Sequence, residues 1–164
     1  MRARAKVATL PALLLALRRA RARGQRVVFT NGCFDLLHAG HIELLERARA
    51  HGDLLVVGLN SDRSVRRLKG PLRPIVPQRD RALVLAGLAS VDFVTIFNEP
   101  TPARLVARIR PDVLVKGADW GAAKIVGRSL VERRGGYIVR IRLVKGRSTS
   151  GLVERLAQAA GRRA

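Results

Sequence analysis

The segment Leu54–Leu59 is an unbroken apolar run, and it constrains the fold of this chain more than any other feature. A strand with one face in water alternates apolar and polar residues, whereas a continuous apolar run indicates a parallel strand covered on both faces. Val27–Thr30 is an earlier run of the same kind, and an amphipathic segment from Gly40 to about Ala50 separates the two. This order predicts a strand, a helix and a second strand, and therefore an α/β fold.

The alternation of short apolar runs and amphipathic segments continues along the rest of the chain. Asn60–Asp62 is expected to cap a helix, and Leu68–Pro77, rich in proline, is expected to be a basic loop. Five strands with helices between them predict a Rossmann-like three-layer sandwich with a five-stranded, mostly parallel sheet. The remaining predicted elements are strands at Phe93–Phe97, Val113–Val115 and Tyr137–Leu143, and helices at Gln78–Leu88, after the cap Thr101 with Pro102, and after Ser148–Ser150.

No linker rich in proline, glycine or serine divides the chain, so residues 1–164 are expected to form one domain with an N-terminal helical extension at residues 1–25. Pro11 and the arginines after Leu17 argue against a secretory signal, and the apolar run is too short to span a membrane. Instead, an apolar face predicts a docking helix, and the same face favours a homodimer. That face consists of Leu10, Leu13, Leu14 and Leu17.

The net charge is +20, from 32 Lys and Arg against 12 Asp and Glu, and the basic residues are spread from Arg2 to Arg163. Two explanations stay open: attraction of a polyanion, or a source genome rich in G and C. A basic nucleic-acid-binding module is the rival interpretation from another functional class. It has little support, because no helix-turn-helix, zinc-finger or aromatic RNA-binding pattern is present. Neither a specific nucleic acid nor a membrane is therefore expected as a partner.

Cys33 is the only cysteine, so an intrachain disulfide is impossible and a cysteine-based zinc site is excluded. A reducing, cytoplasmic setting is expected. No motif frames this thiol as a nucleophile, so we interpret it as a small apolar filler.

Two histidines, His38 and His41, stand three residues apart where the strand Val27–Thr30 is expected to lead into the next helix. At that turn, free backbone N–H groups and the helix dipole favour an anion, and both imidazoles can project from the same face. Neither a Walker P-loop nor a G-x-G-x-x-G pattern is present. The histidine turn is therefore the predicted phosphate site.

Histidines in such a pattern have three other possible roles. A zinc pair needs a third ligand, and the remaining histidine, His51, falls at the far end of the same helix. A role in the core or as a helix cap is the second alternative. A serine triad fails because Gly146–Ser150 lacks the second glycine of a G-x-S-x-G elbow.

The run Asn31–His41 resembles the H-x-G-H nucleotidyltransferase superfamily, in its cytidylyltransferase-like branch. The resemblance extends from about Leu10 to Ala160 and implies a single nucleotidyltransferase domain. Gly146–Ser150 departs from the R-T-x-G-I-S-T pattern of cytidylyltransferases proper, which favours ATP over CTP. The segments most similar to adenylyltransferases that act on heptose 1-phosphate are 60–62, 66–70, 73–74, 78–79, 111–120 and 148–150.

This resemblance implies a set of site residues. The catalytic residues are expected to be His38, His41, Lys69 and Arg79. The nucleotide is expected to contact Thr30, Asn31, Gly32, Phe34, Gly40, His41, Lys116, Gly117, Asp119, Ser148 and Thr149. The acceptor phosphate compound is expected to contact Asp35, Asn60, Asp62 and Arg73.

Some roles stay open within this set. Lys116 is expected to contact either the nucleotide or the acceptor. Asp35 would orient a histidine, approach a metal or cap the helix, and Trp120 would pack beside the site or stack on a base. No protein metal site is expected, and Mg²⁺ is expected to accompany ATP.

The reaction implied by the resemblance is attack of heptose 1-phosphate on the α-phosphorus of ATP, giving ADP-heptose and pyrophosphate. Two alternatives stay open: a cytidylyltransferase acting on glycerol 3-phosphate, or one acting on another small phosphate such as ethanolamine phosphate. The heptose enzyme is often fused to a sugar kinase domain, for which 164 residues leave no room, so another protein is expected to phosphorylate the sugar.

Overall fold

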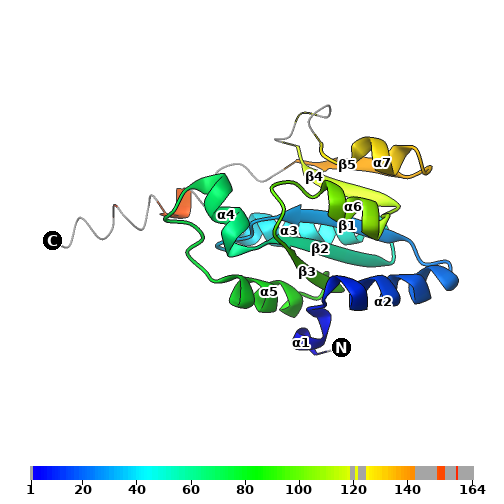
Figure 1. Ribbon diagram of the computed structural model, residues 1–164, viewed down its shortest axis with the longest axis horizontal. Coiled ribbons are helices and arrows are strands. Elements are labelled where there is room, and N and C mark those ends of the chain that lie inside the picture. The colour runs from blue at the N-terminus through cyan, green and yellow to red at the C-terminus, as the bar shows by residue number, and fades with distance from the viewer. Residues whose placement is uncertain (1, 119–120, 122–124, 143–150, 154–157, 159–164) are drawn as a thin grey trace.

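The structure is a computed structural model, and it describes residues 2–118, 121, 125–142, 151–153 and 158. Helices and strands alternate along most of this length (Figure 1). The elements are α1 (Ala3–Lys6), α2 (Leu10–Ala22), β1 (Val27–Gly32), α3 (Ala39–Arg49), β2 (Leu54–Asn60), α4 (Asp62–Lys69), α5 (Gln78–Gly87), β3 (Phe93–Phe97), α6 (Ala103–Ile109), β4 (Val113–Gly117), α7 (Arg128–Glu132) and β5 (Tyr137–Ile141).

The five strands form one sheet in the order β3-β2-β1-β4-β5, and every pair is parallel. Strand β1 is central, with Val28 paired to Leu55 of β2 on one side and to Val113 of β4 on the other. The chain moves outward from β1 to β3 and then crosses back to β4, so the strand order reverses between β1 and β4. In open α/β sheets, ligands bind beyond the carboxyl ends of the strands at such a reversal.

Helices cover both faces of the sheet and complete the predicted three layers (Figure 1). On β2, Leu55 and Val57 face the layer of α3 and α5, whereas Val56 faces the layer of α2, α6 and α7. All three side chains are fully buried. Because neither face of β2 meets water, apolar residues are favoured at every position of the strand, and this explains the unbroken apolar run in the sequence.

The N-terminal extension packs against the domain as predicted, and α2 continues to Ala22. Leu13 and Leu17 are fully buried in the core beneath α6, so the face that favoured a homodimer is largely covered within the chain. Before α2, Val7 forms a parallel bridge to Val94, and the Ala8 N–H donates to the Val94 carbonyl at 2.9 Å. The extension thereby shields the exposed edge of β3.

Several predicted boundaries were wrong. Helix α4 extends through Leu68 to Lys69, because the helix-forming residues continue until Gly70, which adopts a φ of 95°. Helix α6 has Pro102, not Thr101, at its N-cap position. The short helices α1 and α7 were not predicted. Leu143 and the hydroxyl-bearing segment Ser148–Ser150 lie outside the described residues.

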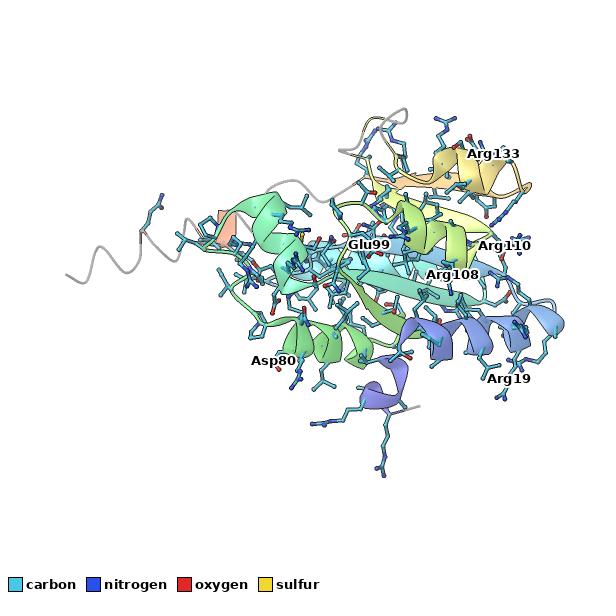
Figure 2. All side chains as sticks on the ribbon, in the orientation of Figure 1. Arg19, Asp80, Glu99, Arg108, Arg110 and Arg133 are labelled. Atoms are coloured by element: carbon cyan, nitrogen blue, oxygen red, sulfur yellow. The ribbon has the colours of Figure 1, made fainter. Side chains whose placement is uncertain are left out.

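The charge is distributed unevenly between the helical layers. Helices α2 and α6 contain arginines and no acidic residue, whereas α3 holds both Glu43 and Glu46 beside Arg47 and Arg49. Figure 2 shows Arg19 on α2 and Arg108 on α6 projecting from the arginine-rich layer. Within the described part of the chain, no helix is long and apolar enough to cross a membrane.

Candidate active site

The turn between β1 and α3 is shaped by a glycine and an aromatic ring. Phe34 has a φ of 43°, which is uncommon for a residue with a side chain, and its ring folds back over Gly32. A Cβ atom at Gly32 would lie 3.0 Å from that ring, so a larger residue would push the ring away. Phe34 is buried and contacts the His41 ring at a centroid distance of 5.2 Å. The turn therefore sets the position of His41.

The His38 and His41 rings stack, with centroids 3.9 Å apart and planes 24° apart. This confirms that the two imidazoles project from one face. His38 is the N-cap residue of α3, and it makes no capping hydrogen bond with its side chain. The first turn of α3 thus presents backbone N–H groups without a capping side chain, and Gly40 is buried in that turn. An uncapped helix start beside two imidazoles suits an anion.

Electrostatics keep His41 neutral near pH 7. Burial is the largest cause, the neighbouring His38 is the next and Lys69 the third, and together they lower the pKa of His41 from 6.5 to about 4. The Nδ1 atom of His41 is buried and has no hydrogen-bond partner among the described residues. A bound anion would reverse the shift, because negative charge favours the imidazolium form.

Lys116 supplies a cation at the strand reversal. Its side chain is 9% exposed on β4, and its ammonium group donates hydrogen bonds to the side-chain and main-chain oxygens of Asn31 on β1. Thr30 and Gly117, on the same two strands, are buried. Lys116 therefore lies beside residues of β1 that are expected to contact the nucleotide, and its own ligand stays a prediction.

Asp35 has a role that the sequence did not predict. Its side chain is fully buried, and one oxygen accepts hydrogen bonds from the backbone N–H groups of Ile75 and Val76 at 2.8 and 3.0 Å. The other oxygen lies 2.6 Å from Nε of Arg73. The carboxylate of Asp35 anchors the 70–77 loop and does not cap α3, whose N-cap is His38, so the predicted cap was wrong. The other roles expected of Asp35 stay predictions. The side chain of Arg73 forms an ion pair with the same carboxylate.

Arg81 is a functional candidate that the sequence reasoning missed. Its guanidinium is completely buried and donates to four acceptors. These are the carbonyls of Val76, Cys33 and Asn60, and Oδ1 of Asp62 at 2.7 Å. The signal was present in the sequence, because Arg81 shares the buried face of α5 with Ala82 and Leu85. A charge on an apolar face indicates a buried partner.

Asn60 and Asp62, predicted to contact the acceptor, both have hydrogen-bond partners within the chain, and contact with the acceptor stays a prediction. The side-chain amide of Asn60 donates to Oγ of Ser64 at 2.9 Å, and the main-chain carbonyl of Asn60 accepts from Arg81 at 3.0 Å. Asp62 pairs with Arg81, and its backbone N–H donates to Gln78. Both residues thus hold the end of β2 and the start of α4.

The two expected catalytic cations lie on either side of the 70–77 loop. Lys69 is exposed at the end of α4, and its charge contributes to the lowered pKa of His41. Arg79 is exposed in the first turn of α5.

Burial raises the pKa of the Cys33 thiol, which disfavours a nucleophilic role. Asp119, Trp120, Ser148 and Thr149 lie outside the described residues.

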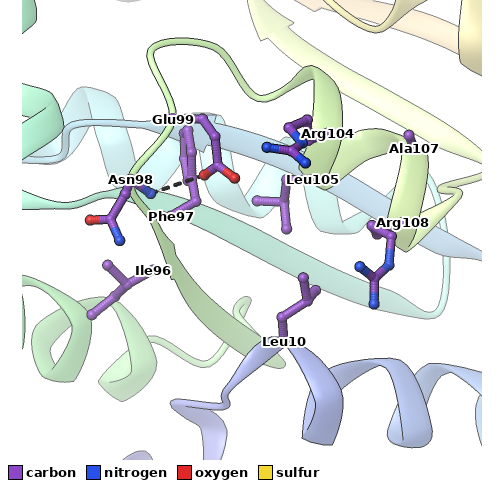
Figure 3. A pocket seen from close by; sticks show the side chains of 9 residues that line it. All are labelled: Leu10, Ile96, Phe97, Asn98, Glu99, Arg104, Leu105, Ala107 and Arg108. Carbon is purple, nitrogen blue, oxygen red and sulfur yellow. Dashed lines mark hydrogen bonds between the residues drawn. The ribbon is translucent and has the colours of Figure 1, made fainter.

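A separate groove of about 540 Å³ lies between the start of α2, the end of β3 and α6 (Figure 3). None of the expected site residues lines it. Phe97 and Leu105 lie among apolar lining residues, and Arg104 and Arg108 add two cations from α6. This groove is distinct from the histidine turn.

The parallel sheet, the strand reversal and the paired imidazoles define a nucleotide-binding α/β protein of the H-x-G-H type. A family model described as cytidylyltransferase-like matches residues 29–141. The chain belongs to the cytidylyltransferase-like family.

The chain is also similar in sequence to curated proteins. The chain is 55% identical over 136 residues to the bifunctional protein HldE of Syntrophotalea carbinolica, a match covering 83% of this chain and 28% of that protein. It is 50% identical over 157 residues to the HldE protein of Geobacter sulfurreducens, covering 96% and 32%. The chain thus spans less than a third of the length of these relatives.

The structure is also similar to two solved structures. A lipopolysaccharide core biosynthesis protein from Thermoplasma volcanium superimposes with a TM-score of 0.61 at 29% identity, over 76% of this chain and all of that one. A pantoate-beta-alanine ligase from Francisella tularensis gives a TM-score of 0.60 at 15% identity, over 88% and 68%. The second likeness concerns the fold alone.

Proposed function

We propose that this chain transfers AMP from ATP to heptose 1-phosphate, giving ADP-heptose and pyrophosphate. The observation that carries the proposal is the stacked pair His38 and His41 at the uncapped start of α3. The likeness to HldE proteins and to a lipopolysaccharide core biosynthesis protein supports a sugar phosphate as acceptor. The match covers less than a third of each HldE protein, and these proteins are named bifunctional. A match of that length is consistent with one of the two activities.

In the proposed reaction, a phosphate oxygen of heptose 1-phosphate attacks the α-phosphorus of ATP. A new P–O bond forms as the bond between the α-phosphorus and the bridging oxygen breaks, and pyrophosphate leaves with that oxygen. No covalent enzyme intermediate is needed, because the acceptor itself is the nucleophile. Positioning and charge stabilisation therefore supply the catalysis.

The histidines would donate hydrogen bonds to phosphate oxygens, and each such donor contributes about 2.7–4 kcal/mol in comparable oxyanion sites. Bringing two anions together is costly: at an effective dielectric constant of about 20, two unit charges about 4 Å apart repel by roughly 4 kcal/mol. Lys69, Arg79 and Lys116 would offset this repulsion. The influence of the Lys69 charge on His41 and the hydrogen bond from Lys116 to Asn31 support such a role for these two residues.

The carboxylates described at the site do not fit the role of resident metal ligands. Asp35 and Asp62 are engaged with arginines, and the described residues contain no group of three metal-ligating side chains. We therefore propose that Mg²⁺ enters as part of the substrate MgATP. We also propose that the chain acts in the cytoplasm as a single domain over residues 1–164, with ATP and a sugar phosphate as partners. We propose a homodimer on the family resemblance alone, because the apolar face of α2 is largely covered within the chain.

The test is a crossed panel of ATP and CTP with heptose 1-phosphate and glycerol 3-phosphate, read by pyrophosphate release. We expect release only with ATP and heptose 1-phosphate. Release with CTP and not with ATP would overturn the nucleotide assignment, and release with glycerol 3-phosphate alone would overturn the acceptor. An inactive His41→Ala variant should accompany the panel to exclude a contaminating enzyme.

A further inference from the structure

Two buried side chains behind the histidine turn connect that turn to the 70–77 loop. We call Asp35 and Arg81 the loop clamp. Asp35 belongs to the turn after β1, whereas Arg81 belongs to the first half of α5. Neither side chain is exposed to solvent.

Arg81 joins four segments through one planar group. Its acceptors are Cys33 in the histidine turn, Asn60 at the end of β2, Asp62 at the start of α4, and Val76 in the loop. A buried guanidinium is tolerated only when its donors are paired, and its fork fixes the directions of those bonds. The relative positions of the four segments therefore depend on this side chain.

Asp35 makes the complementary connection. A guanidinium can only donate hydrogen bonds, and Arg81 donates one to the Val76 carbonyl. The carboxylate of Asp35 accepts hydrogen bonds from the N–H groups of Ile75 and Val76. The loop backbone is thus held through donors and acceptors at adjoining peptide groups. Such paired contacts leave the loop little freedom to slide along the histidine turn.

We propose that Arg81 is a positioning residue for nucleotidyl transfer. The loop that it fastens runs between Lys69 and Arg79, so the clamp sets the distance of these two cations from His41. Arg81 acts through the loop and does not touch substrate, because its guanidinium is completely buried. This inference rests on the proposed function.

The expected effect falls on kcat more than on KM. The nucleotide would be bound mainly by the histidine turn and α3, whereas the loop cations would meet the charge that develops during transfer. Displacing such groups by about 1 Å costs on the order of 100-fold in rate. Arg81→Lys keeps the charge, but one ammonium cannot reach the four acceptors of a guanidinium. We expect kcat to fall about 100-fold, with KM for ATP changing less than about threefold.

The experiment compares Arg81→Lys and Asp62→Asn with Leu17→Ala, a control in the opposite core layer. Kinetics are measured well below the Tm of each variant, and hydrogen exchange is measured at the amides of Ile75 and Val76. We expect faster exchange at both amides and lower kcat in Arg81→Lys, and a smaller loss of about 10-fold in Asp62→Asn. The control should lower Tm while leaving kcat and loop exchange unchanged.

The proposal is overturned if folded Arg81→Lys keeps kcat within threefold of wild type, or if loop exchange stays unchanged. It is also overturned if Leu17→Ala loses as much kcat, because the effect would then reflect stability alone. If Arg81→Lys does not fold, the proposal is tested with Asp62→Asn through the same two measurements, kcat and hydrogen exchange at Ile75 and Val76. If wild type releases no pyrophosphate with any substrate pair, the proposed function fails, whereas loop exchange and calorimetric ATP binding still test the clamp.

Discussion

The histidine pair and the loop clamp are neighbours, yet the structure holds them by opposite means. His41 is positioned by ring contacts with Phe34 and His38, and its buried Nδ1 has no hydrogen-bond partner in the described part of the chain. Asp35 and Arg81 instead have polar partners on several segments. We infer that the two regions have separate roles: His41 is available to a ligand, whereas Asp35 and Arg81 fix the positions of the surrounding segments.

The largest effect that would sharpen this contrast is loss of activity without loss of stability. His41→Ala removes a donor to the phosphates, so we expect kcat/KM to fall by about 10²–10³-fold, the cost of removing one oxyanion donor. The unfolding free energy should change little, because the lost ring contacts are offset by removal of a buried nitrogen that has no hydrogen-bond partner among the described residues. Pyrophosphate release and urea unfolding measure the two quantities. Near-normal turnover in this variant would break the comparison.

The clamp should show the opposite pattern, with stability lost together with activity. Arg81→Met leaves Asp62 and three carbonyls without their donor, and breaking a buried ion pair costs about 3–5 kcal/mol. We expect a loss of that size in the unfolding free energy, measured by urea unfolding. The exposed pair Arg128 and Glu132 provides the control, because Arg128→Met should cost less than about 1 kcal/mol. Equal costs at the two positions would contradict the structural role of the clamp.

Lys69 should affect catalysis without affecting stability. Its ammonium is exposed near His41, so Lys69→Ala should lower kcat by about 10-fold, because the charge that develops during transfer loses a neutralising cation. Arg67→Ala on the same helix is the matched control, because it also removes an exposed cation. Steady-state kinetics at two salt concentrations measure the effect. A similar fall in kcat for both variants would show that only the overall charge matters.

The remaining expected effect is a pH dependence of stability. The pKa of His41 is about 4 in the folded chain, whereas an unperturbed histidine in the unfolded chain has a pKa of 6.5. Between these two pH values the unfolded chain therefore binds more protons than the folded chain. The unfolding free energy should therefore fall as the pH decreases from about 6.5 to about 4. His41→Gln should make this dependence shallower in urea unfolding across that range. An unchanged slope would argue against a buried neutral imidazole.

Local patterns in the sequence predicted much of the fold and the central pair. Strand β3 was placed at its observed bounds, and the three-residue spacing of His38 and His41 predicted that their rings share a face. Both depend on residues close together in the chain, where the periods of strands and helices operate.

Contacts between distant residues could not be predicted in the same way. Asp35 meets Ile75, 40 residues further on, through a loop whose path depends on tertiary structure. Lys116 reaches Asn31 because β4 lies beside β1, and the order of strands in the sheet differs from their order in the sequence. Resemblance named Asp35, Asn60, Asp62 and Arg73 as acceptor contacts, but it did not show that these side chains have partners within the chain.

A histidine NMR titration with ATP and Mg²⁺ tests most directly whether the two imidazoles bind the nucleotide. The chain has three histidines, and His51 stands just after the end of α3 beside Tyr137, so it serves as an internal control. We predict that ATP shifts the resonances of His38 and His41, raises the pKa of His41 above about 4, and leaves the resonances of His51 in place. Saturable ATP binding that shifts neither His38 nor His41, or that shifts His51 equally, would show that the nucleotide binds elsewhere.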